Sequence, residues 1–161
     1  DGCPRRVRAR ASRLKETVNA LEQRLGRTAT EDEVAAELGI SRREYDKWLE
    51  EVRPATFVAL DRSLDGEEGE GATLQDVLCD ENDVTGRETL EREDVLKLLT
   101  QKMAEMPDIP RKVLAMYYFE GMRLAEIAAV FGVTESRVCQ IHSQAILSLR
   151  GYLQRMVADD R

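Results

Sequence analysis

A nine-residue pattern that occurs twice in the chain places the tightest limit on its fold. Residues 33–41 read EVAAELGIS and residues 126–134 read EIAAVFGVT, with four of nine positions identical and four more conservatively changed. The alanine at the third position allows two helices to cross closely, and the glycine at the seventh permits a positive φ in the turn between them. An apolar residue six positions after each glycine, Tyr45 or Val138, anchors the second helix. The pattern predicts two helix-turn-helix motifs; a plain corner between two helices is the alternative.

The sequence before and around the first copy predicts three helices. Apolar residues recur at three- and four-residue steps from Val7 to Leu25, and Gly26 follows as a helix stop. Thr30 and Glu33 have the spacing of a capping box for a helix over residues 31–38. A third helix begins after Ser41, and its apolar side carries the following residues: Tyr45, Trp48, Leu49 and Val52.

The second copy lies in a stretch with the same kind of signals. Pro110 suits the first turn of a helix that Gly121 ends. Thr134 is a candidate N-cap for a helix to about Arg150. Its apolar stripe consists of Val138, Ile141, Ala145 and Leu149. The opposite face carries amide, hydroxyl and guanidinium groups, which hydrogen-bond base edges in a major groove, on the following residues: Ser136, Arg137, Gln140, Ser143 and Gln144. This composition favours a helix that reads DNA over a merely solvated one.

The net charge of −7, from 24 basic and 31 acidic residues, argues against a nucleic-acid binder only as an average. Residues 54–94 carry 3 basic and 13 acidic side chains, whereas residues 1–53 have a net charge of +1 and residues 95–161 of +2. We therefore predict an all-α protein of two small helical domains, at residues 1–53 and 87–161, joined by an acidic linker at residues 54–86.

Several other classes of function find little support in the sequence. No apolar run approaches the roughly 18 residues of a membrane span. The three cysteines are far apart and form no CxxC motif, which favours free thiols in a reducing, cytoplasmic setting. A single histidine, His142, leaves no metal cluster or catalytic triad, so we expect neither an enzyme nor a cofactor. His142 is interpreted either as a contact to the DNA backbone or as a semi-buried residue with its hydrogen bonds made.

The C-terminal residues resemble region 4 of bacterial RNA polymerase sigma factors. The resemblance rests on the following residues: Pro107, Arg111, Val113, Leu114, Tyr117, Tyr118, Gly121, Leu124, Glu126, Ile127, Ala128, Gly132, Val133, Thr134, Arg137, Val138, Gln140, Ile141, Ala145, Leu149 and Arg150. The first eight residues, together with Thr30 to Trp48, resemble region 3 of the flagellar and sporulation (FliA/WhiG-like) group of alternative sigma factors. The acidic segment matches, by position, the linker between these regions.

The resemblance implies DNA contacts for named residues. The helix after Thr134 would read the −35 promoter element through Glu135, Ser136, Arg137 and Gln140. Region 3 would approach DNA near −10 through Arg5, Arg6 and Arg8. Basic and polar side chains around the helix after Thr134 are candidates for contacts to phosphate, and for Arg123 the resemblance implies the same contact. These candidates are the following: Arg111, Lys112, Arg123, His142, Gln144 and Arg150.

The resemblance also implies partners. These are core RNA polymerase, promoter DNA and an anti-sigma factor, which in this group sometimes requires a small-molecule messenger. The chain begins without Met and without the family's region 2, so we expect a fragment or processed form that does not open a promoter alone. Two alternatives remain from the residues themselves: a stand-alone helix-turn-helix regulator, which would dimerise on palindromic sites, and a helical adaptor that binds protein only.

Overall fold

The computed structural model describes residues 4–57 and 92–159, and every regular element in these ranges is a helix. The predicted all-α class is confirmed. Before the gap lie α1 (Arg5–Leu25), α2 (Glu31–Leu38), α3 (Arg42–Glu51) and α4 (Arg53–Thr56). After it lie α8 (Arg92–Glu105), α9 (Asp108–Leu114), the π-helical turn η1 (Ala115–Phe119), α10 (Leu124–Phe131) and α11 (Glu135–Asp159).

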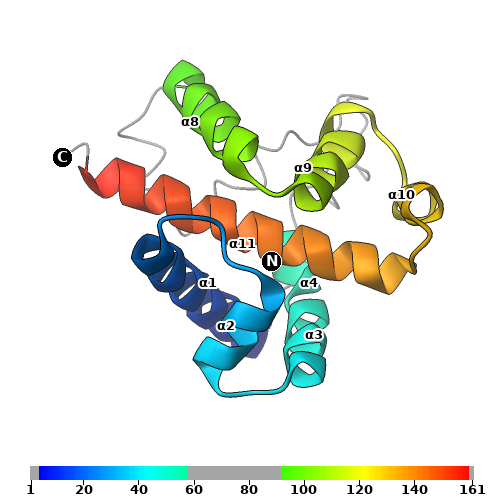
Figure 1. The fold of residues 1–161 in the computed structure, drawn as a ribbon, viewed down its shortest axis with the longest axis horizontal. Helices are drawn as coiled ribbons and strands as arrows, with labels where there is room; N and C mark the ends of the chain where they lie inside the picture. The colour runs from blue at the N-terminus through cyan, green and yellow to red at the C-terminus, as the bar shows by residue number, and fades with distance from the viewer. Residues whose placement is uncertain (1–3, 58–91, 160–161) are drawn as a thin grey trace.

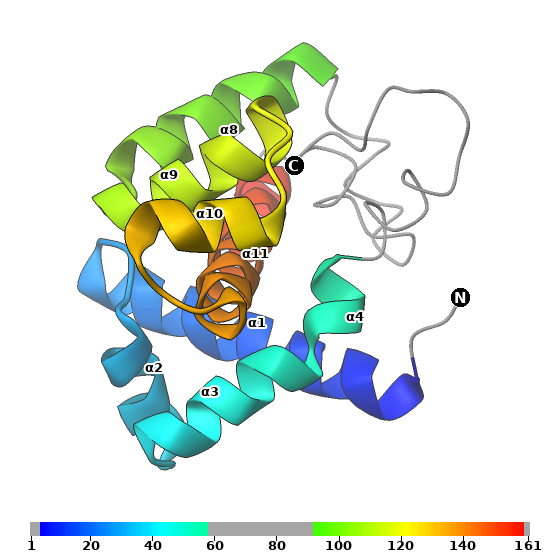
Figure 2. The ribbon, with the colours of Figure 1, turned by 90° about the vertical axis from the view of Figure 1, so that its right-hand side faces the viewer.

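Helix α11 forms the axis of the molecule (Figure 1). Helices α1 to α4, the N-terminal lobe, pack along one side of it, while α8, α9 and α10, which with α11 form the C-terminal lobe, lie along the other (Figures 1 and 2). The apolar core is divided accordingly. Leu147 of α11 joins the core of the N-terminal lobe, Ile146 and Leu149 join the core under α8 and α9, and Val138 packs with α10. Cys139 of the same helix packs with Phe57, so one helix contributes to four hydrophobic clusters.

Local signals in the sequence define the helix boundaries as predicted. The Thr30 hydroxyl accepts a hydrogen bond from the Glu33 amide at 3.2 Å, and the Glu33 carboxylate accepts one from the Thr30 amide at 2.8 Å. This is a complete capping box at the start of α2. Ser41 caps α3 through the Glu44 amide.

Helix α11 extends nine residues beyond the predicted end at Arg150. The extension passes Gly151, which is an ordinary helical residue rather than a stop. A β-carbon at this position would lie 2.9 Å from Cβ of Asn19 on α1. The glycine therefore allows α11 and α1 to cross at close range, and Arg155 beyond it donates hydrogen bonds to Asn19.

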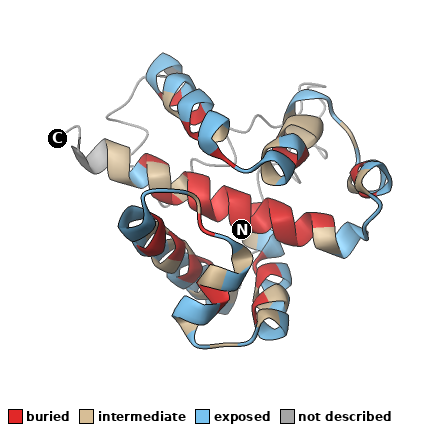
Figure 3. Cartoon of the chain, viewed as in Figure 1, coloured by how far each residue is buried: buried red, intermediate tan, exposed pale blue. Residues whose placement is uncertain are grey.

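The burial of α11 is the largest departure from the sequence prediction. All residues from 138 to 149 are buried, on every side of the helix, as the continuous red band in Figure 3 shows. The predicted apolar stripe is buried in the C-terminal lobe. The polar face, which the sequence predicts to be open to DNA, is covered by the N-terminal lobe.

The predicted linker at residues 54–86 lies mostly outside the described residues. Its first residues instead belong to the fold: Pro54 sits in the first turn of α4, which a proline tolerates, and Phe57 is buried. The domain boundaries themselves stay a prediction, and in the described residues the two lobes pack directly on each other. Within those residues, no helix combines the length and the apolar character that crossing a membrane requires.

Candidate nucleic-acid interface

The two copies of the nine-residue pattern adopt the same turn. At the end of α2 the amide of Ile40 donates to the Ala35 carbonyl at 3.1 Å, and at the end of α10 the amide of Val133 donates to the Ala128 carbonyl at 3.0 Å. The intervening glycines have left-handed backbones, with φ of 75° at Gly39 and 70° at Gly132. Both alanines are buried where the helices cross. The two predicted helix-turn-helix motifs are confirmed as α2–α3 and α10–α11.

The first turn of α11 is the exposed part of the predicted reading helix. The Thr134 hydroxyl accepts a hydrogen bond from the Arg137 amide at 3.1 Å, which confirms the predicted N-cap. Glu135 and Ser136 are both exposed to solvent. Two of the four residues expected to read bases are therefore accessible in this arrangement, and their contact with DNA stays a prediction.

The guanidinium of Arg137 is held by the N-terminal lobe. Its Nη1 and Nη2 lie 2.9 and 2.6 Å from the two carboxylate oxygens of Glu31, in the two-point geometry that an arginine also uses toward a guanine edge or a phosphate. Glu31 is in turn paired with Arg42 at 2.7 Å. The carboxylate thus occupies the donors that a nucleic acid would require.

Two glutamines of α11 are also engaged by the N-terminal lobe. Gln140 donates to the Glu50 carboxylate at 2.8 Å. The Tyr45 hydroxyl donates to the side-chain oxygen of Gln144 at 2.6 Å, and the Gln144 amide donates to the Ala29 carbonyl at 3.1 Å. Burial raises the pKa of Tyr45 well above its usual value and keeps this hydroxyl a donor.

A buried ionic group joins the lobes further along α11. Glu22 of α1 accepts hydrogen bonds from the Ser148 hydroxyl at 2.8 and 3.0 Å and from the Ala29 amide at 3.0 Å. Nζ of Lys102 on α8 lies 3.6 Å from the same carboxylate, and both side chains are at most 5% exposed. Because a buried charge requires partners, this group fixes how α1, α8 and α11 meet.

His142 lies in the interior rather than beside a surface for DNA. Its ring stacks on Phe57 with 3.9 Å between ring centroids, and its Nε2 lies 2.6 Å from the Tyr118 hydroxyl. Burial, and then the nearby guanidinium groups of Arg150 and Arg53, lower the pKa of His142 to about 3. The imidazole is therefore neutral. The ring is fully buried, which agrees with the second interpretation drawn from the sequence in its burial, but only Nε2 is hydrogen-bonded, and Nδ1 has no partner among the described residues.

The remaining phosphate candidates lie in different settings. Arg111 and Lys112 both pair with Asp108, at 2.6 and 3.0 Å, and these two cations lower the pKa of that carboxyl. Arg150 donates to the Ala55 carbonyl of α4 at 3.1 Å. Arg123 is exposed and precedes α10, where its amide donates to Glu126 at 2.8 Å. Of this group, His142 and Gln144 are buried, and all six DNA contacts stay predictions.

The arginines predicted for region 3 lie together on the first turns of α1. Arg5, Arg6 and Arg8 are all exposed, so the structure leaves this face accessible. Further along α1, Arg10 pairs with Glu51 and lies 4.0 Å from the ring centre of Trp48. No group of His, Cys, Asp and Glu side chains suited to a metal ion occurs among the described residues.

The sequence prediction missed the residues that cover the polar face of α11. Glu31 and Glu50 do not stand out in the sequence, because each is one of several acidic residues in a predicted helix. Glu22 and Lys102 carried no signal, because their partners are far away in sequence. The available signal was on α11 itself, whose polar face is rich in amides and hydroxyls and poor in charge. This composition suits a buried polar interface as well as it suits DNA.

Comparison with protein families identifies the chain. A family model for Sigma-70 region 3 matches residues 10–95, and one for Sigma-70, region 4 matches residues 103–151. The first covers more than half of the chain and includes most of α1 and all of α2 to α4, while the second includes α9, α10 and most of α11. The chain belongs to the sigma-70 family.

Curated relatives belong to the flagellar branch. The chain is 35% identical over 153 residues to RNA polymerase sigma factor FliA of Yersinia enterocolitica, covering 95% of this chain and 65% of that protein. It is 36% identical over 154 residues to FliA of Pseudomonas aeruginosa (95% and 60%) and 27% identical over 157 residues to the RNA polymerase sigma-D factor of Bacillus subtilis (98% and 61%). The chain thus spans just under two thirds of the length of these relatives.

Two solved structures of related proteins are similar to the chain. One is described as the cocrystal structure of the flagellar sigma/anti-sigma complex Sigma-28/FlgM, with 28% identity, a TM-score of 0.45 and coverage of 96% of this chain and 62% of that one. The other, a Sigma-28(FliA)/FlgM complex, has 29% identity, a TM-score of 0.42 and coverage of 92% and 61%.

Proposed function

We propose that the chain is the promoter-recognition part of an alternative sigma factor of the flagellar group, acting with core RNA polymerase in the cytoplasm. It has no catalytic role of its own. The observation that carries this proposal is the pairing of the region 3 and region 4 family models with the two helix-turn-helix motifs in one chain. A stand-alone regulator or a helical adaptor would not require both regions.

The proposal assigns two DNA-binding surfaces to the chain. The N-terminal end of α11 reads the −35 element through Glu135, Ser136, Arg137 and Gln140, and the arginine-rich start of α1 contacts DNA near −10. Support for the first surface comes from the exposed position of Glu135 and Ser136 beside the helix-turn-helix turn. Support for the second comes from the shared exposure of Arg5, Arg6 and Arg8.

The arrangement of the lobes supports a closed, non-binding state. Arg137 and Gln140 hydrogen-bond to Glu31 and Glu50, so their donors are taken while the lobes are docked. In our proposal the lobes must separate before α11 enters a major groove. An anti-sigma factor that binds both lobes would then inhibit transcription by holding the docked arrangement.

Selection of duplexes from a randomised DNA library, by the whole chain, tests this function. We expect enrichment of an asymmetric sequence, because the two DNA-binding surfaces are different. The variant Glu31→Gln should bind the selected DNA several-fold more tightly, because the neutral amide releases Arg137 from its two-point contact. Arg137→Ala should lose the sequence preference, at a cost of about 1–3 kcal/mol in discrimination.

The matched control is Glu37→Gln. It removes the same charge from the same helix, but Glu37 pairs with Arg24 on α1 and not with α11. A gain in affinity that is equal in both variants would reflect net charge alone and would contradict the closed state. Palindromic selected sites would indicate a stand-alone regulator, and the absence of any preference would indicate an adaptor.

A further inference from the structure

The residue after α4 carries an aromatic side chain of the N-terminal lobe into the C-terminal lobe. Phe57 follows α4 directly and is only 3% exposed. Its ring stacks on His142 with 3.9 Å between ring centroids, and it forms a T-shaped pair with Tyr117 at 5.7 Å. The other members of its apolar cluster, Cys139, Tyr117 and Leu124, all belong to the C-terminal lobe. Phe57 therefore contributes to the docking of the lobes rather than to the core of its own lobe.

Two polar contacts beside Phe57 join the same segment to α11. The Thr56 hydroxyl lies 3.2 Å from the Ser143 hydroxyl, and both residues are buried. Arg150 donates to the Ala55 carbonyl at 3.1 Å. Residues 55–57 thus form a short docking segment of which Phe57 is the apolar part.

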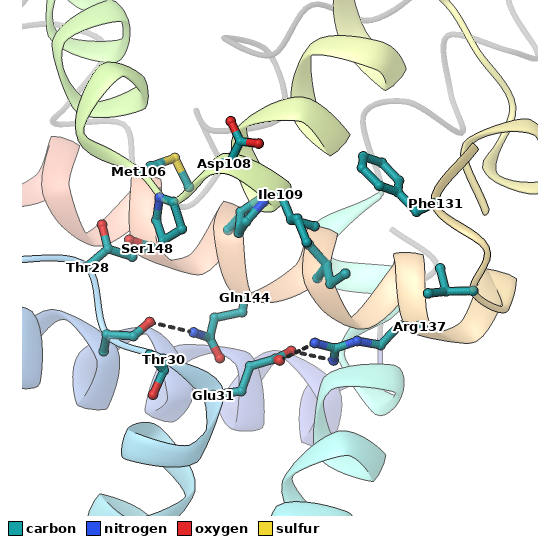
Figure 4. A pocket seen from close by; sticks show the side chains of 16 residues that line it. Thr28, Thr30, Glu31, Met106, Asp108, Ile109, Phe131, Arg137, Gln144 and Ser148 are labelled. Carbon is teal, nitrogen blue, oxygen red and sulfur yellow. Dashed lines mark hydrogen bonds and ion pairs between the residues drawn. The ribbon is translucent and has the colours of Figure 1, made fainter. Parts of the chain in front are cut away.

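Other contacts between the lobes lie toward α2. Figure 4 shows Arg137 and Gln144 of α11 reaching the N-terminal lobe, where the first pairs with Glu31 and the second donates to a backbone carbonyl. His142 differs from these groups, because an imidazole ordinarily changes its charge between pH 5 and 8. It is also the single histidine of the chain, and the stack with Phe57 places it at the junction of the two lobes.

The docked arrangement disfavours a proton on His142. The imidazole is fully buried, and its Nε2 lies 2.6 Å from the Tyr118 hydroxyl. Its Nδ1 has no hydrogen-bond partner among the described residues. A protonated imidazole carries a donor on both nitrogens, so one of the two donors would stay buried without an acceptor.

The charges that act on the ring are also unfavourable to a proton. After burial, the guanidinium groups of Arg150 on α11 and Arg53 on α4 lower the pKa of the imidazole to about 3. The titratable neighbours are Tyr117 and Tyr118 of η1 and Cys139 one turn earlier on α11. Burial raises the pKa of Tyr118 and of Cys139, so neither group supplies a negative charge at neutral or acidic pH.

We propose that Phe57 and His142 form an acid-sensitive latch: the lobes dock on a neutral His142, and a proton on this ring favours their separation. Separation removes the Phe57 ring and the Arg53 guanidinium, so that solvent reaches the imidazole. Because the open form then binds the proton more tightly, docking is at full strength above about pH 6.5 and weakens as the pH falls below this value.

Opening of the latch also frees the donors of Arg137 and Gln140, which Glu31 and Glu50 hold in the docked form. Acid should therefore increase the affinity for DNA. This consequence rests on the function proposed above, whereas the latch itself does not.

Proton NMR of the imidazole in the whole chain tests the latch, because a single histidine gives one set of ring signals. We expect the wild-type ring to stay neutral down to about pH 5. Phe57→Ala removes the covering ring without changing the core of the N-terminal lobe, and its imidazole should titrate near pH 6 to 6.5. Phe119→Ala is the matched control, because Phe119 is 69% exposed, and it should titrate like the wild type.

The Cys139 thiol reports the separation of the lobes, because it is 3% exposed and packs on Phe57. Its rate of reaction with 4,4′-dithiodipyridine, measured by mass spectrometry apart from Cys3 and Cys79, is divided into the rate for the urea-unfolded chain at the same pH. We expect this protection to fall about ten- to thirtyfold from pH 8 to pH 5, as for an open-form pKa of about 6 to 6.5. Circular dichroism should show unchanged helix content, and His142→Gln should abolish the fall.

Three results would overturn the proposal. The first is a wild-type imidazole that titrates near pH 6.5 while Cys139 stays protected, because the docked form would then accept the proton. The second is an imidazole that stays neutral in Phe57→Ala as it does in the wild type. The third is a fall in protection that is equal in His142→Gln, or that accompanies a loss of helix, because another group or unfolding would then explain it.

DNA binding separates the latch from the proposed function. Phe57→Ala should bind the selected DNA several-fold more tightly than the wild type and Phe119→Ala do at neutral pH. If Cys139 becomes accessible in Phe57→Ala without a gain in affinity, the latch is confirmed and its role in DNA binding is contradicted. The selection of an asymmetric sequence tests the sigma-factor function in either case.

Discussion

The two helix-turn-helix motifs share a turn but differ in what their second helix does. Helix α3 has 10 residues, buries Tyr45 and Leu49, and leaves its other side exposed. Helix α11 has 25 residues and is buried on every side from residue 138 to 149. The motif therefore specifies the angle between two helices, and the environment of the second helix depends on what else in the chain packs on it.

The polar side chains of α11 make this complete burial feasible. Ser143, Gln144 and Ser148 each find a hydrogen-bond partner in the N-terminal lobe. A second helix with lysines and glutamates at those positions would not be buried without a large desolvation cost. The difference between the motifs thus arises from a face whose groups are polar but mostly uncharged.

The largest effect on stability is expected at the buried Glu22 carboxylate, which accepts hydrogen bonds from Ser148 of α11. Lys102→Met should lower the free energy of unfolding by about 3–5 kcal/mol, because it leaves the Glu22 carboxylate buried without a cation. Urea denaturation measures this loss. The double variant Lys102→Met/Glu22→Gln should recover much of it, because no uncompensated charge remains.

An ion pair of the first motif provides the control. Arg24→Met breaks an exposed pair with Glu37 and should leave the free energy of unfolding nearly unchanged. A loss for Lys102→Met as small as that for Arg24→Met would mean that the charge is not buried, and the contrast between the motifs would not hold.

A smaller loss of stability is expected at acidic pH. The unfolded chain protonates His142 below pH 6.5, whereas the folded protein does so only near its lowered pKa of about 3. The free energy of unfolding is therefore at its full value above pH 6.5 and decreases by about 1.4 kcal/mol per pH unit between pH 6.5 and 3, or about 2 kcal/mol at pH 5. In α3, the second helix of the other motif, the buried titratable group is Tyr45. Burial raises its pKa, so the hydroxyl stays protonated throughout this pH range and adds no slope.

Denaturation at several pH values between 5 and 6.5 measures the slope. The chain has one histidine, so His142→Gln should flatten it. The carboxyls with a lowered pKa, such as Glu33 at about 2 and Glu37, lose their contribution only at lower pH. The same slope in the wild type and the variant would place His142 in contact with solvent.

The smallest effects concern the feature that the motifs share. Gly39→Ala and Gly132→Ala should each cost about 1–2 kcal/mol, because both glycines have a left-handed backbone that alanine adopts with strain. A β-carbon would meet no atom within 4 Å at either position, so no steric difference separates the two. Unequal losses in thermal or urea denaturation would show that the turns are not equivalent.

Much of the fold could be predicted because its signals are local. The Thr30 and Thr134 caps and the glycine turns act within four residues of the backbone they stabilise, and all of them are confirmed. The π-helical turn η1 at Ala115–Phe119 has no comparable signal, and the prediction of one continuous helix to Gly121 misses it.

The covering of the candidate site could not be predicted, because it depends on distant pairs. Arg137 and Glu31 are separated by 106 positions, and nothing around Glu31 distinguishes it from other acidic residues in a first helical turn. The sequence places Gln140 and Gln144 on the polar face of this helix and predicts DNA contacts for both. Their hydrogen-bonding capacity is the same for a protein lobe and for a base edge, so the residues alone do not tell which is bound.

The proposed double use of α11, toward the N-terminal lobe and toward DNA, has a consequence for substitutions in this helix. If the same side chains face the N-terminal lobe in one state and bases in the other, then the affinity for DNA and the balance between closed and open forms are not independent quantities. A substitution at Gln140 that alters which promoter is read also alters its bond to Glu50, and with it the fraction of molecules that are open. Promoter preference would evolve together with basal activity, and new specificities would require compensating changes at Glu31 or Glu50.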